Sequence, residues 1–401
     1  MTESTKTPAA RFGGRGLNLG IIIAAIMTVV GLVLWGVQLT QGLVVTNMRN
    51  LDSWGLYITS FMFLVGLSAG GLIISSVPRA FGVKGFGGIS KIAVWTSICC
   101  TVLAIAFVIV DLGNPLRIWE LFAYSNLTSP LMWDIIVLTV YLILSIVYLW
   151  ATLRFENGKG SEMALRIISV IALITAILVH SVTAWIFGLQ QGRELWNTAL
   201  LAPWFVSSAL VCGVALVLVV VIVLRKIGYM ELAQDHVVKM LKLLGVFVLV
   251  DLYFFGCDLL TASFPGGSGA DVVTMLISGA LAPFFWIEIV LCGFAALIAF
   301  VPKLRINPLI VAAAIAAIVA IFCKRVQLLV GGFQIPNIDY AGVMTSSTIT
   351  NWTAGMGAYQ SLVYFPTLFE FGIVLGVVGL GLLMLLLGFK YLPLKPAEAL
   401  R

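Results

Sequence analysis

Charged residues are scarce in this chain. Asp, Glu, Lys and Arg make up 10% of the 401 residues, whereas hydrophobic residues make up 61%. Soluble globular domains have about 25% charged residues, so the composition excludes a water-soluble fold. The mean hydropathy of +1.11 agrees. Only helices and closed barrels satisfy their backbone groups in lipid, and the sequence lacks strand-like alternation. The chain is therefore predicted to be an all-α polytopic membrane protein.

Histidine is also scarce, and cysteine occurs without metal-binding spacing. A membrane cytochrome that moves electrons across the bilayer usually holds each haem with two histidines on facing helices. The sequence has one histidine, His180, in a predicted span and a second, His236, in a predicted loop. Its six cysteines all fall in predicted spans and form no C-x-x-C motif. Buried cysteine usually acts as a small apolar side chain. We therefore expect this chain to bind no haem and no iron–sulfur cluster of its own.

Ten apolar stretches are long enough to cross a hydrocarbon core, which is about 30 Å thick. They lie near residues 17–40, 54–76, 92–112, 131–153, 165–188, 202–224, 243–263, 281–301, 306–330 and 365–388. With the N-terminus placed inside, 18 of the 23 Lys and Arg residues fall on the cytoplasmic side. The positive-inside rule thus predicts that both termini are cytoplasmic. Because the basic residues are scattered over short loops, the net charge of +6 is a topology signal and does not indicate a nucleic-acid partner.

A sequence repeat indicates that a membrane unit has been duplicated. SPLMWDIIVL at 129–138 returns as APFFWIEIVL at 282–291, so that Pro130 matches Pro283 and each copy carries an acid. Four spans per copy give both copies the same orientation, related by an axis along the membrane normal. We predict two duplicated four-helix bundles, spans 2–5 and spans 6–9, flanked by spans 1 and 10. The predicted organisation is a cytoplasmic tail at 1–16, span 1 with an outer loop at 17–50, a first bundle at 51–190, a second bundle at 191–335, an outer loop at 336–364, and span 10 with a cytoplasmic tail at 365–401.

Ionisable residues inside the predicted spans are the main functional signal. Each costs about 2.5–3.5 kcal/mol at a helix centre on insertion scales, and persists when it is paired, hydrated or useful. Structural ion pairs account for some of them. The predicted span directions nevertheless place most of them in or near the outer half, with Asp251 near the middle. The outer-half residues are Asp111, Asp134, His180, Asp258, Glu288, Lys324, Arg325 and Glu370.

Several separated motifs occur in order along the first half of the chain. They are WGLYITSFMFLVGLSAGG at 54–71, DLGNPLR at 111–117, SPLMW at 129–133 and HSVTAWIFG at 180–188. Together they closely resemble the NrfD/PsrC family, the integral membrane subunits of polysulfide-reductase-type complexes. The last motif is similar to the ten-span branch of that family, which includes membrane subunits of the menaquinone reductase complex and of alternative complex III. The resemblance covers roughly residues 50–390.

The resemblance implies a quinone-binding subunit of a respiratory oxidoreductase complex in the bacterial inner membrane. Such a subunit exchanges electrons with a ferredoxin-like iron–sulfur subunit at the outer face, often alongside a molybdopterin-type catalytic subunit or a multihaem cytochrome. The redox centres are then expected in the partners, and menaquinone is the favoured quinone. The loop at 336–364 is too long to be a simple connector, so we expect it to dock the electron-transfer partner, with a disordered or self-packed loop as the alternative.

Carried over residue by residue, the resemblance implies a quinone site in the first bundle near the outer surface. His180 is predicted to be the hydrogen-bond and proton partner of a quinone oxygen, with a hydrogen-bonded core histidine as the alternative. Asp111 is predicted to exchange protons. The predicted quinone-binding residues are Trp54, Tyr57, Asp111, Asp134, His180 and Trp185. Membership of an interfacial aromatic belt is an equally good interpretation of Trp54 and Trp185.

The second predicted bundle holds a candidate proton route. Carboxylates and cations within reach of one another can relay protons. The residues are Asp251, Asp258, Glu288, Lys324 and Arg325, with Glu370 from span 10. Where the ten-span branch commonly has an acid–arginine pair in span 9, this sequence has Lys324 and Arg325. Proton translocation is therefore left open.

A secondary transporter is the alternative function, because transporters also combine duplicated bundles with buried charges. The predicted spans lack the paired Gly- or Pro-broken segments at mid-depth that usually form a transport site. A passive membrane anchor would leave the buried acids unexplained. We therefore favour the quinone-binding subunit.

Overall fold

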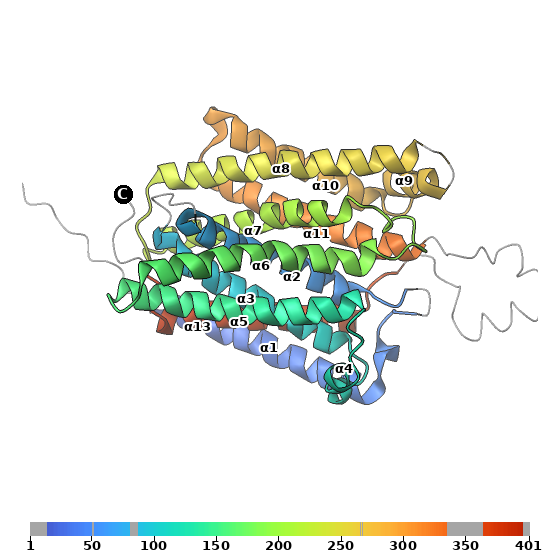
Figure 1. The fold of residues 1–401 in the computed structure, drawn as a ribbon, viewed down its shortest axis with the longest axis horizontal. Coiled ribbons are helices and arrows are strands. Elements are labelled where there is room, and N and C mark those ends of the chain that lie inside the picture. The colour runs from blue at the N-terminus through green and yellow to red at the C-terminus, as the bar shows by residue number, and fades with distance from the viewer. Residues whose placement is uncertain are drawn as a thin grey trace, which may run out of the picture.

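Long helices account for most of the structure, a computed structural model that describes residues 14–49, 52–80, 87–264, 266, 268–334 and 364–395. Within these ranges, ten helices are long and apolar enough to cross a membrane, and no β-strand occurs. They are α1 (Arg15–Gln41), α2 (Leu56–Ala80), α3 (Gly87–Asp111), α5 (Pro130–Glu156), α6 (Glu162–Gly188), α7 (Leu201–Lys226), α8 (Gln234–Ser263), α10 (Ala282–Phe300), α11 (Asn307–Gln334) and α13 (Leu368–Tyr391). They run alongside one another (Figure 1). The predicted all-helical, multi-pass membrane fold is confirmed.

The two ends of the molecule differ in their short elements. The short helices α4 (Glu120–Ala123) and α9 (Ser268–Ser278) lie at the end where α2, α5 and α7 begin (Figure 1). We call this the outer end, following the charge distribution, and the opposite end the inner end. The orientation itself stays a prediction. The predicted docking loop at 336–364 lies outside the described residues except for Tyr364.

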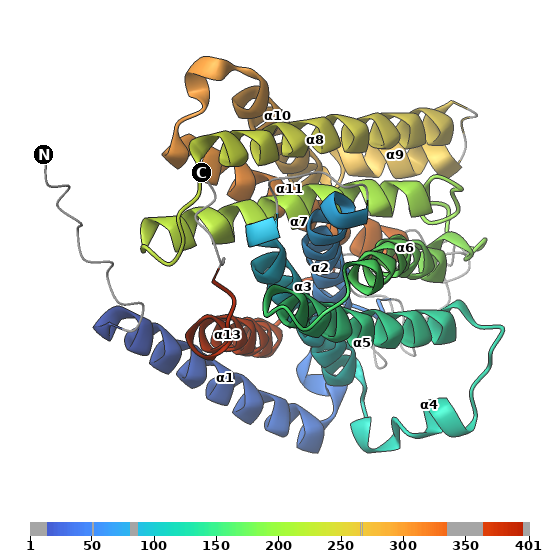
Figure 2. The same cartoon turned by 60° about the vertical axis from the view of Figure 1, so that its left-hand side comes forward.

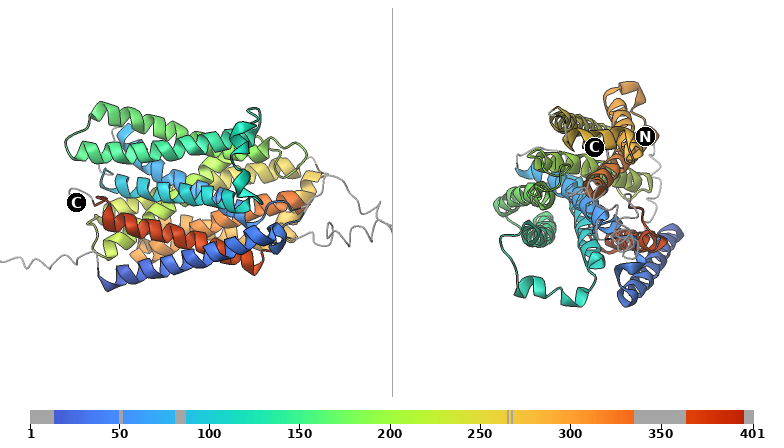
Figure 3. Two further views of the ribbon diagram at one scale, coloured as in Figure 1. Left: turned by 90° about the horizontal axis from the view of Figure 1, so that it is seen from below. Right: turned by 90° about the vertical axis from the view of Figure 1, so that its right-hand side faces the viewer.

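Eight of the described helices form two closed cycles of contacts, and we call these two sets of four the first and the second bundle. In the first bundle α2 contacts α3, α3 contacts α5, α5 contacts α6, and α6 returns to α2. In the second bundle α7, α8, α10 and α11 make the same cycle of contacts. Helices α1 and α13 lie side by side, and α13 packs on α3 (Figures 2 and 3). Because α2 and α7 also contact each other, the division into two duplicated bundles stays a prediction.

The third helix of each bundle starts in the same way. A proline stands in the first turn of α5 and of α10. In α5, the Trp133 indole donates to the carbonyl of Leu127, 2.6 Å away in the preceding segment. In α10, the Trp286 indole donates to the carbonyl of Ile277 at 3.0 Å. Both tryptophans thus fasten the start of a spanning helix to the segment before it.

Glycines bring the two bundles into close contact. A Cβ added to Gly70 on α2 would lie 2.2 Å from the Cα of Gly213 on α7, so only hydrogen fits there. One turn away, a Cβ on Gly66 would lie 3.2 Å from the sulfur of Cys212. Small residues commonly allow this approach between membrane helices. The first and second bundles therefore meet along α2 and α7, which makes contact between their polar groups possible.

Candidate functional site

A cavity of about 280 Å³ lies in the outer half of the first bundle. Its walls come from α2, α3, α5 and α6, and from the segment that joins α3 to α5. Most of the wall is apolar. The described polar groups on it are the indole of Trp54 and the side chains of Asp111, Asp134 and Thr139. The cavity therefore combines an apolar interior with two carboxyl groups.

Asp134 is the fifth residue of α5, just after the first turn, and is buried. Its Oδ1 is 2.5 Å from the hydroxyl of Thr183 on α6, and that hydroxyl is also 2.8 Å from the carbonyl of Val179. A hydroxyl has one hydrogen to donate. Thr183 can donate to an ionised Asp134, or donate to Val179 and accept a hydrogen bond from a protonated Asp134. The contact thus survives in either protonation state of Asp134.

Asp111 is the last residue of α3 and faces the same cavity. Its Oδ1 is buried, and the described residues offer it no hydrogen-bond partner. Buried polar atoms are rarely left unpaired in folded proteins. A ligand oxygen or a water molecule in the cavity would satisfy this carboxyl.

The predicted aromatic residues separate into two groups. Trp54 lines the cavity and meets Phe187 edge-to-face, with the ring centroids 5.9 Å apart. Tyr57 is buried away from the cavity, and its hydroxyl donates to Oε1 of Gln38 on α1 at 2.7 Å. Trp185 does not line the cavity, and 37% of it is exposed on α6. The structure therefore places Trp54 at the site but does not place Tyr57 or Trp185 there.

His180 lies between two helices of the first bundle. Its Nδ1 is 2.8 Å from the carbonyl of Ala176, its Nε2 is 3.1 Å from the carbonyl of Val65 on α2, and it does not line the cavity. A neutral imidazole has a single N–H, so it can donate to only one of these carbonyls. At this depth α6 packs against α2, which directs the ring between the helices. His180 links α6 to α2, and this position does not support a direct contact with a quinone.

A second, more polar cavity of about 420 Å³ adjoins the first on its outer side and shares Trp54 with it. Arg193 lines this cavity and donates to the carbonyl of Gly332 at 3.2 Å. Burial raises the pKa of the nearby Asp52 carboxyl, although the charge of Arg193 opposes this effect. The first bundle thus has a polar space between its apolar cavity and the outer end.

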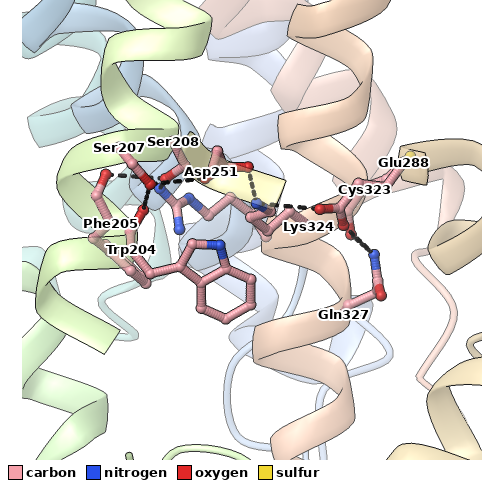
Figure 4. Close-up of polar contacts among 10 residues, drawn as sticks. Trp204, Phe205, Ser207, Ser208, Asp251, Glu288, Cys323, Lys324 and Gln327 are labelled. Atoms are coloured by element: carbon pink, nitrogen blue, oxygen red, sulfur yellow. Dashed lines mark hydrogen bonds and ion pairs between the residues drawn. The ribbon is translucent and has the colours of Figure 1, made fainter. Parts of the chain in front are cut away.

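A cluster of charged residues lies inside the second bundle (Figure 4). The ammonium group of Lys324 pairs with Oδ2 of Asp251 and lies 3.1 Å from Oε1 of Glu288. Gln327 donates to the other Glu288 oxygen at 2.7 Å, and Ser207 donates to Oδ1 of Asp251 at 3.0 Å. All five residues are buried. Helices α7, α8, α10 and α11 therefore each contribute to one network.

Arg325, the neighbour of Lys324, points toward the contact between the two bundles. Its guanidinium donates to the hydroxyl of Ser208 at 2.6 Å and lies 3.8 Å from the centre of the Phe205 ring. A Cβ on Gly66 of the first bundle would lie 3.9 Å from Nη2 of Arg325. A second positive charge thus stands between the cluster and the first bundle.

Two residues of the predicted proton route lie apart from this cluster. Asp258 lines a polar cavity of about 550 Å³ at the outer end, together with Thr198. Glu370 lies in the first turn of α13, where it forms a capping box with Thr367 and accepts a hydrogen bond from the backbone of Asn47 at 3.1 Å. The Glu370 carboxylate accepts hydrogen bonds from backbone amides at the start of α13 and of the Asn47 segment. The structure therefore does not bring Glu370 to the predicted route.

Several uncharged residues that contact the predicted acids or line the cavity were not predicted from the sequence. Thr183 holds Asp134, Gln327 holds Glu288, and Thr139 lines the cavity. Thr183 and Gln327 each follow an ionisable residue, His180 or Lys324, at a spacing of three. Residues three apart lie on the same side of a helix, and that signal could have identified both.

A family model described as polysulphide reductase, NrfD, matches residues 44–337, which contain both bundles. The chain belongs to the NrfD family. It is 32% identical to a Halobacterium salinarum protein named as a membrane subunit of dimethyl sulfoxide reductase, over 99% of this chain and 95% of that one. It is 26% identical to an Hdr-like menaquinol oxidoreductase integral membrane subunit of Archaeoglobus fulgidus, over 94% of each chain. It is 24% identical to a menaquinone reductase integral membrane subunit of Nitratidesulfovibrio vulgaris, over 91% of this chain and 90% of that one. The predicted resemblance is thus confirmed.

Proposed function

We propose that this NrfD-family chain is the quinone-binding membrane subunit of a respiratory oxidoreductase complex. The observation that carries the proposal is the cavity of about 280 Å³, which has apolar walls and two carboxyl groups. Small-molecule sites are typically apolar pockets with a few polar groups that fix the ligand's orientation. A quinone has a flat apolar ring with an oxygen at each side, which matches this distribution of groups.

The residues present fit a quinone, which when bound would supply the two-electron, two-proton chemistry. Trp54 and Phe187 would hold the ring, and the apolar wall would exclude water. Asp111 would exchange a proton at its unpaired Oδ1. Asp134 would do so as Thr183 changes the direction of its hydrogen bond. A carboxyl in hydrogen-bond reach of a reacting oxygen is suited to general acid–base transfer.

The partners in this proposal follow from the relatives, which are named as membrane subunits of oxidoreductases. We propose a ferredoxin-like iron–sulfur subunit at the outer end, with a molybdopterin-type catalytic subunit or a multihaem cytochrome beyond it. The cavity lies near that end, which would keep the electron-transfer distance short. Menaquinone is favoured because the names of two relatives contain it or its reduced form. The membrane would be the bacterial inner membrane, with both termini cytoplasmic.

The charged cluster is proposed to exchange protons toward the outer end. Asp258 is two helical turns from Asp251 on the outward side of α8 and opens into its own polar cavity. Toward the inner end the bundle is filled by buried apolar side chains such as Leu244, Cys292 and Ala317. This packing favours proton handling on the outer side and gives no support to translocation through the second bundle.

A secondary transporter remains the second candidate function. Its structural basis would be the buried cluster around Lys324, since such charges can form a transport site. The relatives are named as oxidoreductase subunits over nearly the whole chain. Substrate-dependent uptake by vesicles that contain the chain alone would favour the transporter.

A tryptophan placed in the cavity tests the quinone site. Ile135 lines the cavity, whereas its neighbour Ile136 does not and is exposed on α5. Overpacking costs about 1–3 kcal/mol, so we expect Ile135→Trp to lower the quinone content of the purified complex roughly tenfold or more. Ile136→Trp should retain the content of the unaltered complex. Quinone extraction followed by chromatography measures both, and equal retention in the two variants would count against this cavity.

A further inference from the structure

The segment between α3 and α5, residues 112–129, stands to one side of the first bundle at the outer end (Figures 2 and 3). It exposes large apolar and aromatic side chains to an unusual degree. Leu116 is 87% exposed, Tyr124 78% and Phe122 63%. Large exposed apolar patches mark contacts with a membrane or a partner. The five side chains that we group as the exposed face of the segment are Leu116, Trp119, Phe122, Tyr124 and Leu127.

This segment also forms part of the cavity wall. Ile118, Leu121 and Phe122 line the cavity from the segment. From α5, Leu131 and Thr139 line it too, although both are exposed at the surface of the helix. The same side chains therefore face both the cavity and the surroundings of the protein. On this side, side chains that are exposed at the surface thus bound the cavity.

We propose that residues 112–129 form a lid in the outer membrane interface, and that the apolar tail of the quinone passes into the cavity laterally, between α3 and α5, beneath this lid. This inference rests on the proposed function and adds the route of entry and the lipid as the occupant of the exposed face. Trp119 and Tyr124 suit such a position, because tryptophan and tyrosine prefer the membrane–water interface.

The charges of the lid are consistent with an interfacial position. Nε of Arg117 is 2.7 Å from Oε1 of Glu120, and Nη2 is 2.8 Å from Oε2 of the same residue. This ion pair is bidentate, and its two formal charges cancel. A groove of about 570 Å³ adjoins the cavity and shares Ile118, Leu121 and Ile135 with it. Both members of the pair line this groove, together with Asn114 and Asn126. The lid thus has polar side chains gathered along a groove as well as its apolar exposed face.

Continuity with α5 favours lipid over a protein partner on the exposed face. Ile136, Val140 and Ile143 are exposed on α5, below the lid, where the helix crosses the membrane. The exposed face of the lid continues this apolar surface at the outer end. A protein that covered the lid would have to extend into the same lipid-facing surface.

The lateral route predicts that quinone tail length matters at the portal. Thr139→Trp places a bulky side chain between the cavity and the lipid. In the reconstituted complex, we expect kcat/KM to fall about tenfold more for a long-tailed menaquinol than for a short-tailed naphthoquinol. The matched control is Ile143→Trp, one turn further along α5, which does not line the cavity and should leave the ratio unchanged. An equal loss for both quinols would overturn the portal. Turnover of neither quinol by the unaltered complex would overturn the proposed function, and this inference with it.

A spin label tests the lid independently of activity. Leu116→Cys, labelled with a nitroxide in nanodiscs, should collide more often with lipid-soluble oxygen than with an aqueous nickel chelate. The control label at Lys159, which is exposed in the loop after α5, should show the reverse. Cys257 would be replaced by serine because it is only partly buried. Aqueous behaviour at both positions, or shielding of Leu116 only when the partner subunits are present, would overturn the membrane position.

Discussion

Replacing Lys324 with methionine is expected to destabilise the chain by about 3–5 kcal/mol, because it leaves buried carboxylates without their cation. The ammonium group is the positive partner shared by Asp251 and Glu288, both of which are fully buried. Methionine matches the length of the lysine stem, so packing is largely preserved and the lost charge dominates. Thermal unfolding of the complex, followed by size-exclusion chromatography, would measure the change.

Two further variants separate charge from packing. The double variant Lys324→Met with Asp251→Asn removes one carboxylate together with the cation, and Gln327 remains to donate to Glu288. It should recover part of the lost stability. Lys239→Met breaks an exposed pair with Asp235 and should change little, because exposed ion pairs contribute weakly. Equal stability of Lys324→Met and Lys239→Met would mean that the buried network does not stabilise the fold.

Asp111→Asn is expected to lower kcat for quinone-linked turnover about 100-fold with a small change in KM, because general acid–base groups contribute about 100- to 10,000-fold. The amide keeps the size of the side chain at the cavity but cannot exchange a proton. Steady-state kinetics of the complete complex would separate kcat from KM. A quinone-content assay would check that binding survives.

The control for Asp111 is a residue that the sequence also assigned to the site. Tyr57→Phe removes the hydrogen bond to Gln38, and Tyr57 does not line the cavity. We expect it to retain most of the activity of the unaltered complex. Equal losses in Asp111→Asn and Tyr57→Phe would indicate that both act through the fold, and would contradict a proton role for Asp111.

The sequence predicted the spans well, because the hydrocarbon core selects long apolar runs. It was less accurate where a helix extends beyond that core. The predicted seventh span begins near residue 243, whereas α8 begins at Gln234. The added turns carry charges, but Val237 and Met240 are buried against the bundle. Hydropathy detects the lipid-crossing part of a helix, and tertiary packing determines where the helix starts.

For the site, the depth of the polar residues could be predicted more reliably than the direction in which they point. Asp111 and Asp134 both reach the cavity, whereas Tyr57 and His180 turn toward neighbouring helices. That direction depends on which helices are adjacent, which is a long-range property of the fold. The capping position of Glu370 was predictable, since T-x-x-E at the start of an apolar run is a capping-box pattern.

The most direct test of a quinone site in the first bundle is labelling of the complete complex with a photoreactive azidoquinone, followed by peptide mapping. We expect the label in residues 105–111 of α3 and 131–139 of α5, and we expect excess menaquinone to prevent it. Labelling confined to the second bundle, or to the inner end of the helices, would contradict it.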